Sequence, residues 1–342
     1  MAIVSDKIWI CPLPMDLTRK SCIMPDFIPT ITQKTNWPTV FGRTAVYKTY
    51  IEALGKFSDE ELAVLGRFVT ENHLPVAVEL GGIRMAAVRP AVADEDIGVE
   101  SARIEWPILE RFIALGGRVD YITTDHALAE MMTGRNKQRA LPREMLFDQM
   151  MQYFTFMREK LPELRCGAIE SLGFFTVEGT NGRLYQQLDP SLIHISFEEY
   201  FDGYLASAQR AGIPIDHFHI DFGMQDVETD GGADGLDYGR VISVETYVQE
   251  RGVQVGFIAA NAFSVPMTLT EAVDDWQGAC RSAAERTLRY FEGYMRAGGR
   301  ADYLILQRWQ PYPIAVGTDE DAPYGQLAIF KSIVTSPLMN TN

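Results

Sequence analysis

The sequence predicts a (β/α)8 barrel (TIM barrel) formed by a single domain, residues 1–342, and two features lead to that prediction. Eight short apolar runs rich in β-branched residues end in polar or charged side chains, and all but the last precede a stretch with helical spacing. Several helical stretches also stop at glycine just before the next run, where glycine supplies a left-handed cap. The runs span residues 8–12, 44–51, 75–82, 119–126, 165–173, 215–224, 253–263 and 301–313.

The connections follow from local sequence signals. The proline-rich segment of residues 13–43 predicts a long irregular connection between the first two strands. Ser58 and Glu61 have the spacing of a capping box, which predicts the start of the next helix. We expect further helices at residues 99–115, 146–161, 196–211, 241–249 and 269–295, the last one bent or broken. The tail, residues 322–342, is expected to be irregular or to form a short helix.

Composition narrows the class of protein. A chain of 342 residues with 46% hydrophobic content suits one barrel domain. The net charge of -15 argues against a nucleic-acid partner and against an anionic membrane surface. No apolar stretch approaches the roughly 18 residues that a membrane span needs. We expect a soluble protein, cytoplasmic or exported if a leader was removed, with its oligomeric state open. The cysteines lack metal-site spacing, although Cys11 and Cys22 could form a bridge.

Acidic residues end four consecutive predicted strands. Side chains alternate along a strand, so in HFHIDF we expect His217, His219 and Asp221 to face the barrel interior. The same alternation is expected to send Glu79 and Glu170 inward and Ile169 outward. Together with Asp125, these carboxylates would crowd one wall at the C-terminal end of the barrel, where the chemistry of such barrels takes place. Crowded carboxylates raise at least one pKa, which keeps a general acid protonated near neutral pH; the alternative is a shared cation.

We expect Glu170 and Asp221 to be catalytic. Other polar or aromatic residues at the strand ends are expected to bind substrate: Lys48, Glu79, Asp125, His126, His219, Asn261, Gln307 and Trp309. Lys48 would neutralise the acidic wall, and His219 would either orient Asp221 or bind a ligand. The competing interpretation is that such interior polar groups merely pair with one another. Three more aromatic residues near the strand ends are candidates for stacking on sugar rings: Trp37, Tyr50 and Tyr312.

Three segments, AIESLG, HFHIDFG and LILQRWQPYP, resemble strand ends of glycoside-hydrolase-like (β/α)8 proteins, and the resemblance covers nearly the whole chain. It implies a carbohydrate-active hydrolase that uses a carboxylate pair on a small-molecule or oligosaccharide substrate and requires no cofactor. Retaining members carry glutamates after strands four and seven, where this chain has Asp125-His126 and Asn261. The pair must therefore come from elsewhere. Glu170 with Asp221 would be a close pair, and Glu79 with Glu170 a wider one.

Two alternatives remain. The chain is also similar to xylose-isomerase-like barrels, which implies a divalent-metal-dependent isomerase or lyase with ligands among Glu79, Glu170, His219 and Asp221; a non-catalytic sugar-binding barrel fits as well. A separate Ca²⁺ or Mg²⁺ site is suggested within residues 226–237, where four acids have nearly the spacing of an EF-hand loop: Asp226, Glu228, Asp230 and Asp237. The other interpretation of that segment is a solvated loop.

Overall fold

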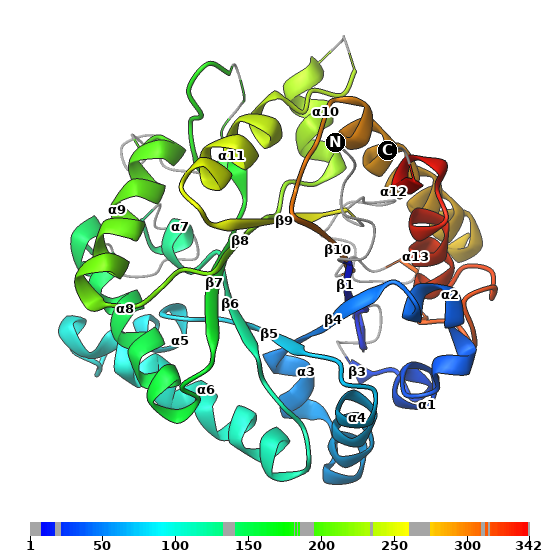
Figure 1. Ribbon diagram of the computed structural model, residues 1–342, viewed down its shortest axis with the longest axis horizontal. Helices are drawn as coiled ribbons and strands as arrows, with labels where there is room; N and C mark the ends of the chain where they lie inside the picture. The colour runs from blue at the N-terminus through cyan, green and yellow to red at the C-terminus, as the bar shows by residue number, and fades with distance from the viewer. Residues whose placement is uncertain are drawn as a thin grey trace.

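The computed structural model describes residues 8–17, 22–132, 141–180, 182, 184, 195–232, 235–259, 274–308, 312–313 and 315–340. Its centre is a closed barrel of parallel strands in the order β1-β10-β9-β8-β7-β6-β5-β4 (Figure 1). Each predicted run contains one strand of the barrel, so the predicted fold class is confirmed. The strands are β1 (Ile8–Cys11), β4 (Thr44–Tyr50), β5 (Val76–Leu80), β6 (Tyr121–Asp125), β7 (Arg165–Glu170), β8 (His217–Ile220), β9 (Gln254–Ile258) and β10 (Tyr303–Gln307).

Helices surround the barrel (Figure 1). They are α3 (Ile51–Lys56), α4 (Asp59–Glu71), α5 (Arg84–Ala87), α6 (Ile97–Ala114), α7 (Ala127–Met132), α8 (Arg143–Lys160), α9 (Phe197–Ala211), α10 (Met224–Gly231), α11 (Gly239–Glu250), α12 (Trp276–Arg296) and α13 (Gln326–Val334). The capping box before α4 is confirmed, because Ser58 and Glu61 each accept the other's backbone N–H. Gly212 ends α9 with a φ of 68°, as its predicted cap requires. Within the described ranges, no helix combines the length and apolar character needed to cross a bilayer.

Three expectations about connections need correction. The first connection is only partly irregular, because its described residues include the antiparallel pair β2 (Met15–Asp16) and β3 (Cys22–Ile23) and the short helices α1 (Phe27–Ile31), η2 (Lys34–Asn36) and α2 (Pro38–Phe41). Its prolines do not prevent helices, because Pro38 occupies the first turn of α2, where no intrahelical N–H is needed. Helix α12 runs unbroken through its described residues. Cys11 is buried, Cys22 is exposed, and both are free thiols.

The barrel interior below its C-terminal end is filled by side chains. The indole of Trp9 stacks on the ring of Tyr303 with centroids 4.5 Å apart, and it also contacts the imidazoles of His217 and His219. The apolar residues of this interior cluster are Trp9, Val46, Ala77, Ile169, Ile258, Tyr303 and Ile305. The interior is therefore a packed core, and any ligand must bind above it, at the C-terminal strand ends.

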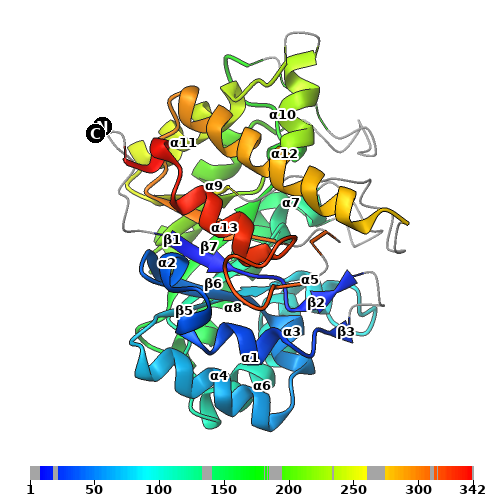
Figure 2. The same ribbon diagram turned by 90° about the vertical axis from the view of Figure 1, so that its right-hand side faces the viewer.

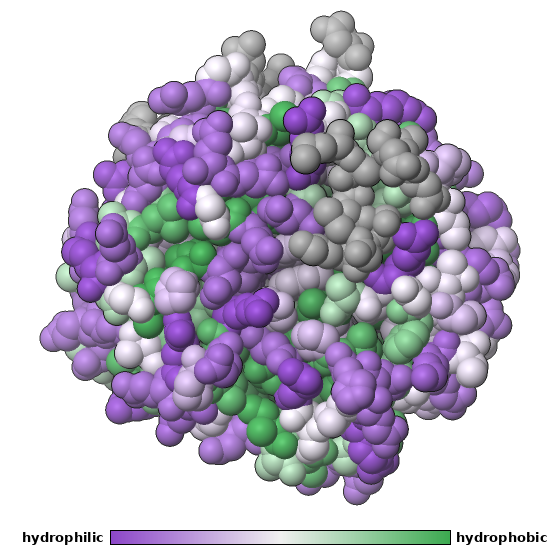
Figure 3. Space-filling view, viewed as in Figure 1, coloured by the Kyte–Doolittle hydropathy of each residue, from purple (hydrophilic) through white to green (hydrophobic). Residues whose placement is uncertain are grey.

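Three aspartates fasten the opposite end, where the strands begin; Figure 3 shows that hydrophilic residues are prominent on this face. Each directly precedes a strand and accepts a backbone N–H from the first or second residue of the strand before it. The bonds run from Val76 to Asp120 (2.8 Å), from Cys166 to Asp216 (2.9 Å) and from Val255 to Asp302 (2.8 Å). We call these three bonds the aspartate clasps. They join β5 to β6, β7 to β8 and β9 to β10.

Candidate functional site

The candidate site lies at the end of the barrel where the strands finish, the end near α5, α7 and the β2–β3 hairpin in Figure 2. Lys48 of β4 is fully buried there, and its Nζ lies 2.7 Å from Glu79 Oε2 of β5. Gln307 of β10 accepts a hydrogen bond from Lys48 and donates one to Glu79 (2.9 Å). Lys48 thus pairs with Glu79, one of the four strand-end carboxylates. Burial nevertheless raises the pKa of Glu79 to about 7, against the opposing effect of Lys48.

Asp125, at the end of β6, is held by Arg84 at the start of α5. Arg84 Nη2 lies 3.0 Å from Asp125 Oδ2, and Nη1 lies 2.6 Å from Glu130 Oε2. Burial acts to raise the pKa of Asp125, but His126 and Arg84 outweigh it and lower that pKa below its ordinary value. Glu79 and Asp125 therefore end neighbouring strands with opposite pKa shifts.

His126 connects the ends of two strands that are not neighbours. Its Nε2 lies 3.3 Å from Asp221 Oδ2 beyond β8, and its Nδ1 lies 3.7 Å from Asp125 Oδ1. Its backbone φ is 46°, a conformation uncommon for histidine. Burial opposes protonation, yet Asp125, Asp221 and Glu170 together raise the pKa of His126 to about 10. His126 is accordingly an imidazolium that contacts Asp221 across the end of β7, the strand between β6 and β8.

Glu170, the last residue of β7, does not face the interior as expected. Ile169 occupies the interior, so alternation along β7 turns Glu170 toward the helices. There its Oε1 accepts hydrogen bonds from the Tyr200 hydroxyl of α9 (2.9 Å) and from the Ala129 N–H of α7 (3.4 Å). Its Oε2 is buried and has no hydrogen-bond partner among the residues that the structure describes. Burial raises the pKa of Glu170 to about 7.

Two other buried glutamates, elsewhere in the barrel, also accept hydrogen bonds from a tyrosine hydroxyl and a backbone N–H, and they provide a comparison. Glu105 accepts from the Tyr153 hydroxyl (2.6 Å) through one oxygen and from the Gly81 N–H (2.8 Å) through the other. Glu245 likewise uses one oxygen for the Tyr294 hydroxyl and the other for the backbone N–H of Arg300. Burial raises the pKa of both carboxyls to about 7. Glu170 differs from them in placing both bonds on one oxygen and leaving the second one free.

His219 is inside the barrel, as expected, but it does not orient Asp221. Its Nε2 shares a hydrogen bond with the Tyr303 hydroxyl (2.9 Å), in the aromatic layer around Trp9. Burial lowers the pKa of His219 well below its ordinary value, so the ring is neutral. Glu79, Glu170 and His219 thus have different neighbours. In the described ranges of the chain, no three histidine, cysteine, aspartate or glutamate side chains are placed to hold one metal ion.

The acidic segment of residues 226–237 is not the expected loop, because Met224–Gly231 forms α10. Asp226 accepts the Gly223 N–H at the start of that helix. The other three acids have different partners again: Glu228 pairs with Arg286, Asp230 with Arg240, and Asp237 with the Gly239 N–H. The EF-hand spacing therefore does not bring these carboxylates to one point.

The aromatic residues expected to stack on sugars are not available in the described part of the chain. Trp37 is fully buried, Tyr312 is 1% exposed, and the Tyr50 hydroxyl donates to the Arg308 carbonyl within the core. Two expected substrate-binding residues, Asn261 and Trp309, lie outside the described residues.

Sequence reasoning missed two side chains that shape the site. Arg84 follows the third predicted strand closely, so the rule that strand ends carry chemistry could have found it. Tyr200 gives no such signal, because it belongs to the apolar stripe of a helix that the sequence predicts only as packing. Its hydrogen bond to Glu170 depends on how α9 packs against β7.

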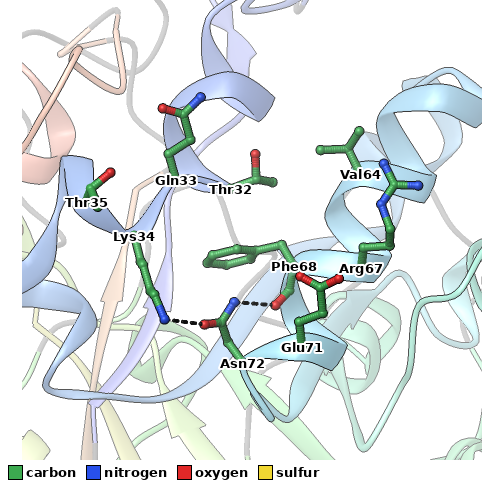
Figure 4. Close-up of a pocket in the computed structure, with 9 residues that line it drawn as sticks. All are labelled: Thr32, Gln33, Lys34, Thr35, Val64, Arg67, Phe68, Glu71 and Asn72. Atoms are coloured by element: carbon green, nitrogen blue, oxygen red, sulfur yellow. Dashed lines mark hydrogen bonds between the residues drawn. The ribbon is translucent and has the colours of Figure 1, made fainter.

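A surface cavity of about 530 Å³ lies elsewhere, between the segment Thr32–Thr35 and the C-terminal half of α4 (Figure 4). In it Lys34 Nζ donates to Asn72 Oδ1 (3.2 Å). Helix α4 ends where β5 begins, so this cavity is at the end of the barrel opposite the candidate site. None of the expected site residues lines it.

Comparisons with known proteins support the fold alone. No family model matches the sequence, and no curated protein matches it. Among solved structures, GH10 from Paenibacillus barcinonensis is similar with a TM-score of 0.50 and 13% identity over 97% of this chain and 94% of that chain. Xylanase B from Clostridium stercorarium F9 has a TM-score of 0.48 and 10% identity over 96% of each chain. The D-psicose 3-epimerase from Clostridium cellulolyticum H10 has a TM-score of 0.42 and 10% identity, covering 87% of this chain and 84% of that chain.

Proposed function

We propose that this protein is a carbohydrate-active hydrolase in which Glu170 is the general acid/base and Asp221 is its partner. The observation that carries the proposal is the free Oε2 of Glu170. A buried carboxyl oxygen without a hydrogen bond costs stability, and Glu105 and Glu245 satisfy both of their oxygens in otherwise similar surroundings. A buried carboxyl oxygen left without a hydrogen bond at the end of β7 fits a group whose partner is a reacting molecule.

The protonation of Glu170 suits glycoside hydrolysis. Since burial raises its pKa to about 7, a substantial fraction is the neutral acid near neutral pH. In this proposal the neutral acid donates its proton to the leaving oxygen of the glycoside and later takes a proton from the attacking water. Asp221, paired with the protonated His126, supplies the second carboxylate. Because Oε2 is closed off from solvent, substrate binding must displace a neighbouring side chain.

The charges at the site favour an uncharged, polyhydroxylated substrate. Glu79 pairs with Lys48, Asp125 with Arg84, and Asp221 with His126. The cations are thus already engaged by carboxylates, which leaves carboxylate oxygens as acceptors for sugar hydroxyls. Glu79, Asp125 and His126 would hold the substrate, together with Lys48 and Gln307 acting through Glu79. No cofactor is required in this mechanism.

The test compares Glu170→Gln with Glu245→Gln. The two glutamates have matching burial and tyrosine partners, but Glu245 joins the outer helix α11 to α12 and lies away from the strand ends. Both variants and the wild type are assayed on a panel of aryl glycosides and oligosaccharides. We expect Glu170→Gln to reduce kcat/KM by about 100-fold or more and Glu245→Gln to retain most activity.

Equal activity of Glu170→Gln and wild type would remove Glu170 from the mechanism. Sugar binding in thermal-shift measurements without turnover by the wild type would instead identify a non-catalytic sugar-binding barrel.

A further inference from the structure

Arg240 of α11 is a buried cation that contacts both connections following the proposed catalytic residues. Its side chain is 2% exposed. Nη1 donates to the carbonyls of Leu172 (2.6 Å) and Phe175 (3.2 Å), which come two and five residues after Glu170. The guanidinium carbon lies 4.7 Å from the ring centroid of Phe222, the residue after Asp221.

Asp230 of α10 fixes the orientation of this guanidinium. Nε lies 2.7 Å from Asp230 Oδ2 and Nη2 lies 3.2 Å from Oδ1, so the pair is bidentate. The Asp230 side chain is 3% exposed, which means that both charges have lost their water. Removing two charges from water offsets much of their attraction, so such a pair is a weak source of stability, and its value can lie in fixing one arrangement.

A second pair from the same helix shows the contrast. Glu228 of α10 forms a bidentate pair with Arg286 of α12, with Nη–Oε distances of 3.2 and 2.8 Å. This pair is about one-third exposed and joins two outer helices. The Arg240 pair is excluded from solvent, and its guanidinium contacts the connections that leave β7 and β8.

We propose that Arg240 is a positioning residue that fixes Glu170 and Asp221 relative to each other by joining the β7 and β8 connections. The strand ladder sets the register of β7 and β8 up to the pair Glu170 and Ile220. The Asp221 N–H still donates to the Glu170 carbonyl (3.1 Å), and after Asp221 the guanidinium of Arg240 is bonded to the β7 connection and stacked on Phe222 of the β8 connection. Since the separation of two carboxyls determines which displacement they support, a shift of about 1 Å would impair the reaction. This inference rests on the proposed function for its effect on catalysis.

The experiment compares Arg240→Lys with Arg286→Lys. Lysine keeps the positive charge but cannot make the fork of bonds to Asp230 while also bonding two carbonyls. Hydrogen–deuterium exchange without substrate is the first measurement, since it needs no activity. We expect faster exchange at residues 171–176 and 221–224 in Arg240→Lys and unchanged exchange there in Arg286→Lys. Asp230→Asn, which retains the side-chain shape, should show the same faster exchange.

Activity is the second measurement, made on the best glycoside from the panel. We expect Arg240→Lys to lower kcat about tenfold or more, with a smaller change in KM and a displaced acidic limb of the pH–kcat profile. Unchanged exchange in both Arg240→Lys and Asp230→Asn would overturn the positioning role. Faster exchange in Arg240→Lys combined with full activity of Glu170→Gln would support the positioning role of Arg240 and refute the proposed function instead.

Discussion

Lys48→Met tests whether the buried cation is required to keep Glu79 in the barrel interior. The Lys48 side chain is fully buried, with Nζ 2.7 Å from Glu79 Oε2. Methionine fills a similar volume without charge or donors, so Glu79 keeps the hydrogen bond from Gln307 but loses its buried cation. Removing one partner of a buried pair leaves an uncompensated charge and costs about 3–5 kcal/mol.

This cost converts to a shift in melting temperature. Unfolding entropy is about 2.1 cal/mol/K per residue, which for 342 residues gives about 0.7 kcal/mol/K. We therefore expect Lys48→Met to lower Tm by about 4–7 °C near neutral pH.

The loss should depend on pH. Burial raises the pKa of Glu79 from 4.5 to about 7 in the folded protein. A carboxyl with a raised folded pKa contributes stability that is complete below about pH 4.5 and is lost as pH rises through about 7. Removing Lys48 raises that pKa further and extends the loss to higher pH. The deficit of Lys48→Met should therefore be larger at pH 8 than at pH 5, where Glu79 is mostly neutral.

The assay is urea unfolding at both pH values for wild type, Lys48→Met, Glu79→Gln and the double variant. Glu79→Gln should restore much of the stability that Lys48→Met loses at pH 8, because a neutral amide needs no counter-ion. A deficit below about 1 kcal/mol at pH 8, or a deficit equal at the two pH values, would refute this account of the pair.

Two further predictions concern other parts of the molecule. Removing any one aspartate clasp by an Asp→Ala substitution should lower the free energy of unfolding in urea by about 1–3 kcal/mol. Sugar binding should be unchanged, since the clasps lie at the other end of the barrel. Altered sugar binding with unchanged stability would contradict this prediction. The substitutions are Asp120→Ala, Asp216→Ala and Asp302→Ala. NMR titration should find His126 charged throughout pH 6–8, because its pKa is raised to about 10. His217 should be neutral over the same range, because burial lowers its pKa to about 3. A titration midpoint of either imidazole within that range would count against the described pairings.

The barrel was predictable because its signals are local. Apolar runs, Ser58 with Glu61, and the glycine caps each report on one segment, and all of them agree on one alternation. The first connection was less predictable, since proline both breaks helices and begins them, and only the tertiary context decides which applies at Pro38.

The positions of the strand-end side chains were predictable in part. The alternation rule placed Glu79 and His219 inside, but it assigned the wrong face to Glu170, because Ala168 and Ile169 are both apolar and fit either side. The pairing of Lys48 with Glu79 was within reach of charge arguments. The contacts of Arg240 could not be predicted from charge, because its carbonyl partners and Asp230 are brought together only by packing.

The aspartate clasps have a consequence for how the barrel tolerates sequence change. A one-residue slip of β5, β7 or β9 would lose ladder bonds and would also move the N–H of Val76, Cys166 or Val255 away from the carboxylate that accepts it. The register of each of these three strand pairs is thus specified both by the backbone ladder and by an aspartate side chain. We therefore expect changes in the loops at the far end of the barrel to leave the alignment of these three strand pairs unchanged.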